Sequence, residues 1–213
     1  MKEYPILMSG PLVRATIDGR KTVTRRPITI PPSAIEWCQG APDRIEPTMY
    51  VSGPGWAAVW EHSRGSTMIG IRCPFGVVGD RLWVRETWAQ GCYPPGKPFR
   101  RAAIWYRADN TTRALRWAPS IHMPRWASRL TLEITGITAE RVQDITDEQA
   151  RAEGLEPKGV DWPILRERAV PDPCRTYRGG FALAWHAIYG ADPVKGWAAN
   201  PWTWAISYRV TVP

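Results

Sequence analysis

The stretch that decides the fold is residues 19–26, which read GRKTVTRR. A helix is expected before it, because Ser-Gly-Pro at residues 9–11 places proline in a first turn, where its missing N–H costs nothing. Gly19 is a typical C-terminal stop for that helix, and the β-branched residues that follow predict an extended segment from Lys21 onward. An apolar run over residues 4–8 predicts a strand ahead of the helix. The N-terminal part of the chain is therefore expected to fold as strand, helix, strand.

The rest of the chain predicts further strands and two short helices. The expected strands cover residues 81–88, 103–106, 129–142 and 202–210. In the longest of them, Gly136 is expected to mark a bulge or a bend. Thr146 and Gln149 form a capping box, in which each side chain satisfies the backbone N–H of the other residue, and the helix that they begin is expected to end at Gly154. A second helix is expected over residues 181–189.

Two long segments interrupt this pattern. Residues 27–70 are irregular and rich in Pro, Gly and Trp, residues 155–180 form a second long loop, and both are expected to be insertions that fold onto the core. Hydrophobic residues make up 44% of the sequence, which is enough for a core, while 21 Pro and 18 Gly argue against a helical bundle. Short strands with few helices predict an α+β fold, a small mixed β-barrel with covering helices. One domain over residues 1–213 is the expected organisation.

Composition and charge narrow the classes of function. A formal net charge of +8 favours polyanionic partners, and the 13 Trp residues suit both a core and base-stacking surfaces. No run reaches the ~18 apolar residues of a membrane span, and the N-terminus lacks a signal-peptide pattern, so a cytoplasmic protein with no membrane partner is expected. The cysteines form no CxxC pair and no histidine has a second ligand at zinc spacing, so no metal or other cofactor is predicted.

The alternation in residues 81–88 separates two faces of the expected strand. Trp83 and Arg85 lie on one face, and the other face is largely apolar except for Glu86. A carboxylate on an apolar face needs a cation or hydrogen-bond donors beside it. Glu86 is therefore either a residue of a functional site or the ion-pair partner of one of the many arginines.

The loop over residues 119–126 combines His122, Arg125 and Trp126. A Trp that stacks on a base, together with an Arg that reaches phosphate, is a usual device for binding single-stranded nucleic acid or a flipped base. The alternative is that Trp126 plugs the end of the barrel while Arg125 extends into solvent. The sequence leaves both interpretations open.

Together these segments resemble the ASCH family, a branch of the PUA-like barrels. The shared motif is G-x-K-x-x-T-x-R, and its residues here are Gly19, Lys21, Thr24 and Arg26. The turn at Gly79-Asp80, the late capped helix that ends at Glu153 and the terminal strand follow in the same order. The chain is most similar to the larger phage- and prophage-type members, through residues 73–76, 81–88, 120–129 and 200–202.

The resemblance implies two kinds of function. PUA-like domains generally bind RNA or modified bases, and some small bacterial ASCH proteins are amidohydrolases that remove the acyl group from N4-acetylcytidine with a Lys, a Thr and a Glu. In this sequence the catalytic positions fall on Lys21, Thr24 and Glu153. The expected activity is removal of an acyl group from an N4-acylated cytidine-type base; the alternatives are a non-catalytic module that binds RNA or modified bases, and a metal-independent ribonuclease. The candidate residues for binding the nucleoside or nucleic acid are Arg26, Trp83, Arg85, Glu86, His122, Arg125 and Trp126.

These residue types fit the chemistry of an amidase. A Thr hydroxyl needs an adjacent base, and Lys21 is one if burial and neighbouring cations keep it neutral. Glu153 would pass a proton to the leaving amine, and Arg26 or backbone N–H groups would stabilise the oxyanion. Residues three apart on a regular strand point to opposite faces, so Lys21 and Thr24 meet only if residues 20–22 form a turn.

Overall fold

The structure is a computed structural model, and it describes residues 1–29, 48–51, 56–61, 68–91, 103–110, 115–156 and 176–211. Its helices are α1 (Gly10–Ile17), α3 (Asp147–Ala152) and α4 (Tyr177–Tyr189). Its strands are β1 (Glu3–Leu7), β2 (Val23–Pro27), β3 (Thr48–Val51), β4 (Trp56–Glu61), β5 (Met68–Arg72), β6 (Arg81–Arg85), β7 (Trp88–Gly91), β8 (Ala103–Tyr106), β9 (Thr131–Arg141) and β10 (Trp202–Thr211). Short 3-10 turns cover Ser120–His122, Arg125–Ala127, Val142–Asp144 and Trp197–Ala199.

A five-stranded sheet forms the centre of the molecule, in the order β1-β6-β9-β10-β2. β1 and β6 are parallel, and the other neighbours are antiparallel. The mixture of strands and helices confirms the α+β class. Among the described strands the two edges, β1 and β2, do not pair with each other, so the sheet is open and the predicted barrel is not confirmed. A side chain spans these edges instead, because the Arg26 guanidinium donates a hydrogen bond to the Leu7 carbonyl at 2.7 Å.

The main apolar core packs against this sheet. Trp204, Ile206 and Tyr208 of β10 are buried in it, as expected for alternate residues that share a face of a strand. Leu82 and Val84 of β6 are buried in the same core, which confirms the alternation predicted for this part of the chain.

The segment from α1 to β2 folds as the sequence predicts. Proline stands in the first turn of α1, and Gly19 has a φ of 72°, a left-handed conformation that glycine adopts without steric cost. The amides of Arg20 and Lys21 then both donate to the Ala15 carbonyl at 2.9 Å. This turn brings Lys21 to the end of α3, where it forms an isolated antiparallel bridge with Glu153.

The predicted capping box forms at the start of α3. The Gln149 amide donates to Thr146 Oγ1 at 3.2 Å, and the Thr146 amide donates to Gln149 Oε1 at 3.0 Å. Glu153 is the C-cap, and Gly154 follows with a φ of 75°. A Cβ on Gly154 would stand 2.7 Å from the Cβ of Lys21. Glycine is therefore required here both by the backbone conformation and by the close approach of Lys21.

The bulge predicted in the longest strand is present. Along β9 and β10, Ser207 pairs with Gly136 and Tyr208 pairs with Ile134, so Thr135 is the extra residue. Such a bulge bends the strand and increases its twist.

The prediction of one strand over residues 81–88 is wrong. β6 ends at Arg85, and the chain resumes as β7 at Trp88 in a different sheet. Between them the Glu86 amide donates to the sulphur of Met123 at 3.3 Å. The amide therefore has a partner outside the sheet, and the ladder stops there.

Two further predictions need correction. Residues 27–70 are not irregular where they are described, because β3, β4 and β5 form an antiparallel sheet; these strands are short, and the turn-forming residues between them dominate the local composition. The last helix begins at Tyr177 rather than at residue 181, because the Thr176 hydroxyl accepts a hydrogen bond from the Gly179 amide at 3.0 Å and caps it. Most of the predicted loop over 155–180, namely 157–175, lies outside the described residues.

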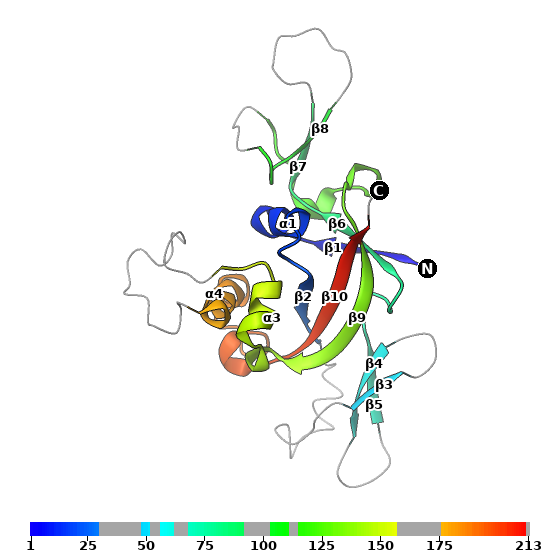
Figure 1. The fold of residues 1–213 in the computed structure, drawn as a ribbon, viewed down its shortest axis with the longest axis vertical. Coiled ribbons are helices and arrows are strands. Elements are labelled where there is room, and N and C mark those ends of the chain that lie inside the picture. The colour runs from blue at the N-terminus through cyan, green and yellow to red at the C-terminus, as the bar shows by residue number, and fades with distance from the viewer. Residues whose placement is uncertain are drawn as a thin grey trace.

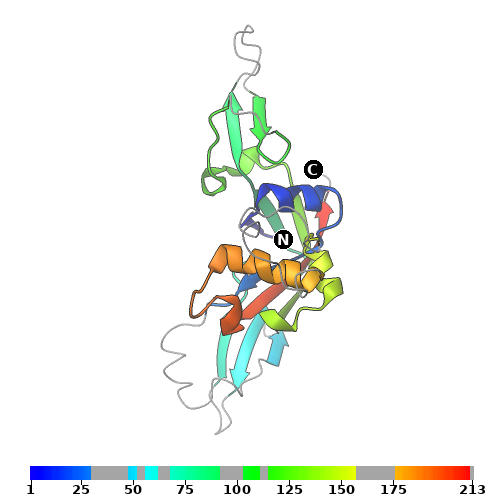
Figure 2. The ribbon, with the colours of Figure 1, turned by 90° about the vertical axis from the view of Figure 1, so that its left-hand side faces the viewer.

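The two smaller sheets project from opposite ends of the central one (Figures 1 and 2). The β3–β4–β5 sheet lies at one end and the β7–β8 pair at the other. α3 and α4 pack together on one side of the central sheet, near β2 and β10, while α1 lies near β1 and β6 (Figure 1). None of the described helices is both long enough and apolar enough to cross a membrane.

Candidate functional site

Lys21 and Glu153 lie in contact between the α1–β2 turn and the end of α3. Lys21 Nζ is 2.6 Å from Glu153 Oε2, and the two side chains are only 0% and 6% exposed. The backbone fixes this approach, since the Thr22 amide donates to the Ala152 carbonyl at 2.8 Å. Two of the three residues that the ASCH resemblance implies as catalytic are therefore brought together from opposite parts of the chain.

The Lys21 ammonium uses all three of its donors. Besides Glu153 Oε2, it donates to the Glu153 carbonyl at 3.1 Å and to the Val23 carbonyl at 2.6 Å. Burial lowers the pKa of Lys21, the Glu153 carboxylate opposes this, and the cations Arg26 and Arg25 lower the pKa further. The site therefore favours loss of a proton from Lys21 more than water does.

Arg25 extends this pair into a chain of alternating charges. Its Nη1 donates to Glu153 Oε1 at 3.3 Å, and its Nη2 donates to Glu140 Oε2 at 2.8 Å. The Thr138 hydroxyl donates to the other oxygen of Glu140 at 2.7 Å. Two cations and two carboxylates thus balance one another in a largely buried network, as interior charges require.

Thr24 is buried on β2, where its register partner is Ile206. The ammonium of Lys21 lies against the peptide group that joins Val23 to Thr24, because it bonds the Val23 carbonyl. Thr24 itself points to the face of β2 opposite to Arg25. No residue in the described ranges hydrogen-bonds to the Thr24 hydroxyl. The turn lies at Asp18 and Gly19 rather than over residues 20–22. Lys21 reaches the backbone beside Thr24, and no hydrogen bond joins the two side chains.

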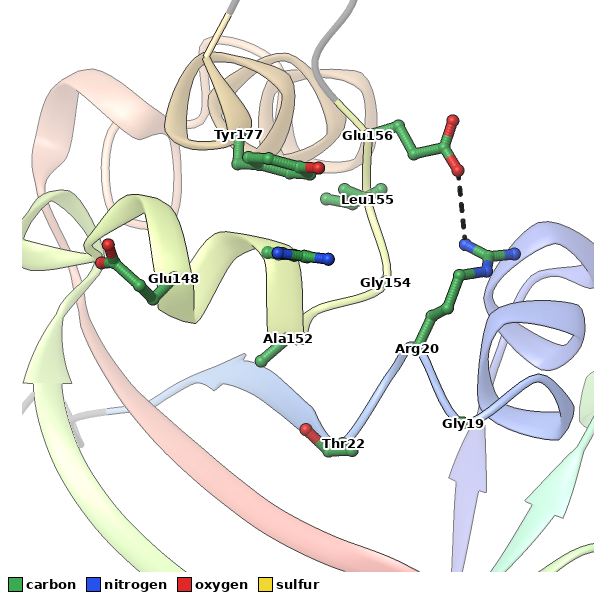
Figure 3. Close-up of a pocket in the computed structure, with 10 residues that line it drawn as sticks. Gly19, Arg20, Thr22, Glu148, Ala152, Gly154, Leu155, Glu156 and Tyr177 are labelled. Atoms are coloured by element: carbon green, nitrogen blue, oxygen red, sulfur yellow. Dashed lines mark ion pairs between the residues drawn. The ribbon is translucent and has the colours of Figure 1, made fainter.

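A hollow of about 600 Å³, which we call the Tyr177 hollow, lies beside the Lys21–Glu153 pair (Figure 3). Residues on either side of the pair line it, with backbone from Ala152 and Gly154 and from the segment that leads into β2. Its polar and aromatic lining comprises Arg20, Thr22, Glu148, Arg151, Glu156 and Tyr177.

Glu86 is held by an arginine, as one of its two interpretations predicts. Arg129 Nε and Nη2 donate to the two Glu86 oxygens at 2.8 and 3.1 Å. Burial raises the pKa of Glu86, while the hydrogen bonds from Arg129 lower it. Arg129 also pairs with Asp109 and lies 4.0 Å from the centre of the Tyr106 ring. This cluster links β8 and the start of β9 to the chain between β6 and β7.

Trp83, Arg85 and Arg125 meet on the surface. Arg85 and Arg125 lie 5.3 and 6.0 Å from the centre of the Trp83 ring. Arg85 also donates to the Ile121 carbonyl, and Arg125 makes a two-pronged contact with Glu3 at 2.8 and 3.1 Å. The predicted surface residues are therefore gathered, with part of the arginine charge already neutralised.

Trp126 does not plug the core. It is 62% exposed, and its ring meets Trp88 edge-on with centres 5.8 Å apart. His122 is also exposed, in the neighbouring 3-10 turn. We call Trp83, Arg85, His122, Arg125 and Trp126 the Trp126 surface.

Sequence reasoning missed Arg25 and Glu140 as members of the buried network. One signal was available for Arg25, because it stands four residues after Lys21 and an even spacing puts both on one face of an extended segment. Glu140 carries no such signal, because its contact with Arg25 joins residues 115 positions apart. Within the described part of the chain, no group of three His, Cys, Asp or Glu side chains is placed to hold a metal ion.

Comparison with protein-family models, with curated proteins and with solved structures gives no match. The likeness to the ASCH family therefore rests on the sequence motif and on the other segments named above.

Proposed function

We propose that this protein is an amidohydrolase that removes an acyl group from an N4-acylated cytidine-type base. The observation that carries the proposal is the buried contact of 2.6 Å between Lys21 Nζ and Glu153 Oε2. Paired acid–base groups that are shielded from water are typical of sites that transfer protons. The resemblance to the ASCH family supplies the substrate class.

The proposed reaction begins with Lys21 in its neutral form. The Thr24 hydroxyl attacks the acyl carbonyl carbon while its proton passes to Lys21. The carbon–nitrogen bond then breaks, the leaving amine takes that proton with Glu153 as relay, and an acyl ester remains on Thr24. Water hydrolyses this ester, which yields the free carboxylic acid and restores Thr24.

Arg26 is the proposed donor to the oxyanion of the tetrahedral intermediate. It lies on the same face of β2 as Thr24. Its Nη1 already donates to the Arg25 carbonyl and its Nη2 to the Leu7 carbonyl, so the oxyanion would take the remaining N–H groups. The proposal requires the Thr24 hydroxyl to approach the neutral Lys21 amine, so Thr24 is the residue that tests it most sharply.

The test is release of cytidine from N4-acetylcytidine by the purified protein. We expect Lys21→Met, Thr24→Val and Glu153→Gln each to lower the turnover by about 100-fold or more. Thr203→Val is the matched control for Thr24, because Thr203 is a fully buried threonine on the neighbouring strand β10. No turnover by the wild-type protein, or equal turnover by Thr24→Val and wild type, would rule out this mechanism.

A second candidate function, binding of single-stranded RNA or DNA without chemistry, is favoured by one specific observation. Trp126 presents a largely exposed ring, and a base stacked on such a ring contributes about 1–3 kcal/mol. Arg85 and Arg125, which both lie over the Trp83 ring, would contact the phosphates.

Affinity for a single-stranded oligonucleotide, measured over a range of salt concentrations, tests this second function. Affinity should fall steeply with salt, and Trp126→Ala should weaken it about tenfold or more. Ile188→Ala is the control, since Ile188 is a comparably exposed apolar residue on α4. Following the length of an RNA ligand in the same samples tests for ribonuclease activity.

A further inference from the structure

The Tyr177 hollow has the dimensions and the lining of a ligand site. Its volume of about 600 Å³ lies within the range of small-molecule pockets in proteins. Tyr177 lies on one side of it and Thr22 on the other, with Arg20 and Glu156 to one side (Figure 3).

The floor of the hollow is backbone that hydrogen bonds hold in place and that packs against the Lys21–Glu153 pair. Gly154 packs directly on Lys21, with no room for a side chain between them. The Thr22 amide bonds Ala152, and the Thr22 carbonyl accepts from the Tyr208 amide at 2.9 Å. A ligand in the hollow would therefore rest on the backbone that holds the buried pair.

Flat groups face the hollow. The Arg151 guanidinium lies over the Tyr177 ring, 5.9 Å from its centre, so the arginine covers one face of the ring. Planar bases bind proteins by stacking on surfaces of this kind.

The charges of the lining favour a neutral ligand. Arg20 and Arg151 are balanced by Glu148 and Glu156, so the formal charge of the polar lining is zero and an isolated phosphate gains little. Arg20 is engaged with Glu156 at 3.7 Å and with Asp18 at 2.9 Å. In the described part of the chain, no residue accepts a hydrogen bond from the Arg151 guanidinium. Toward the described residues, Arg151 therefore keeps its donors available for an acceptor on a ligand.

We propose that the Tyr177 hollow binds a nucleobase beside the Arg151–Tyr177 pair, with its carbonyl and ring-nitrogen acceptors facing Arg151. Arginine pairs readily with such acceptor edges, and the Thr22 hydroxyl and the two glutamates offer partners to the amino group of a base. The inference rests on the proposed function for the choice of cytidine-type bases, and it adds a recognition site beside the buried pair.

The experiment measures binding of cytidine, the product of the proposed reaction, to the full chain by calorimetry. Arg151→Gln and Tyr177→Leu should each weaken binding about tenfold or more. The matched control is Arg178→Gln, because Arg178 lies 5.8 Å from the Trp197 ring at a different hollow and forms the same kind of pair. Circular dichroism of each variant checks that α3 and α4 remain folded.

Three outcomes would overturn the inference. These are equal affinity of the Arg151→Gln and Tyr177→Leu variants and wild type, equal weakening by Arg178→Gln, or displacement of cytidine by inorganic phosphate. The design separates this inference from the proposed function. Normal turnover of N4-acetylcytidine by Arg151→Gln, with unchanged cytidine affinity, removes the site and leaves the amidohydrolase. Absent turnover together with cytidine binding that requires Arg151 removes the amidohydrolase and leaves the site.

Discussion

Two glutamate carboxylates are buried in this protein, and each is neutralised by a different set of cations. Glu153 is held by Lys21 and Arg25, and Glu86 is held by Arg129. Burial lowers the pKa of Lys21, whereas the hydrogen bonds to Glu86 and Asp109 outweigh burial and raise the pKa of Arg129. A lysine can lose its proton in such a place, and an arginine does not.

Under the proposed function, this difference separates a site that transfers protons from a contact that joins segments. The Lys21–Glu153 pair also stands beside a hollow, whereas Arg129 lies against Tyr106 and pairs with a second carboxylate, Asp109. Both sites contain a carboxylate and a cation within hydrogen-bond distance, so residue type alone does not tell them apart. The two sites are distinguished by whether the cation is lysine or arginine and by whether a hollow lies beside it.

The largest effect on stability is expected when each glutamate is replaced by leucine. Glu153→Leu leaves Lys21 without its carboxylate partner in the interior and should lower the free energy of unfolding by about 3–5 kcal/mol. Glu86→Leu leaves Arg129 with Asp109 and partial exposure, and it should cost less. Urea unfolding of both variants makes the measurement, and an equal loss would mean that the two sites do not differ.

Exchanging lysine and arginine sharpens the comparison. Lys21→Arg keeps the charge and removes the ability to give up a proton, so turnover of N4-acetylcytidine should fall by about 100-fold or more. Arg129→Lys should lower stability and leave turnover unchanged. Wild-type turnover by Lys21→Arg would show that Lys21 acts only as a charge.

The glycine beneath the Lys21 site gives a smaller effect. Gly154→Ala combines a left-handed backbone with a Cβ that collides with both Ala15 and Lys21, and a loss of about 1–3 kcal/mol is expected. Gly19→Ala has a similar φ of 72° and open space around the new Cβ, so it reports backbone strain alone. Thermal unfolding of the two variants separates strain from collision, and equal losses would mean that the close packing of Gly154 on Lys21 contributes nothing.

The smallest effect is a slope of stability with pH. Because the pKa of folded Lys21 lies below its ordinary value of 10.5, the unfolded chain binds this proton more tightly, and stability rises with pH through that window. The difference between wild type and Lys21→Met should therefore grow toward pH 10.5 by at most about 1.4 kcal/mol per pH unit. Arg129→Met should show no such slope relative to wild type. Urea midpoints across this range make the measurement, and a difference that falls with pH would reverse the sign assigned to Lys21.

Local signals in the sequence were reliable where the physics is local. The proline in the first turn of α1, the capping box at Thr146 and Gln149, and the bulge beside Gly136 all depend on neighbouring residues, and each is present. The prediction of one strand over residues 81–88 is wrong from Glu86 onward, because the Glu86 amide donates its hydrogen bond to the sulphur of the distant Met123. The short strands between residues 48 and 72 were not predicted for a related reason, since their pairing depends on residues in other strands.

The sequence by itself determined the N-terminal strand–helix–strand order, the alternation that buries Leu82 and Val84, and the motif that points to Lys21 and Thr24. These features follow from periodicity, capping and glycine conformation, which act over a few residues. Only the tertiary structure decided that Glu153 meets Lys21, that Arg25 joins them, and that Trp126 is exposed. Such contacts join residues more than 100 positions apart, and burial of a single side chain depends on every element packed around it, so no local pattern in the sequence specifies them.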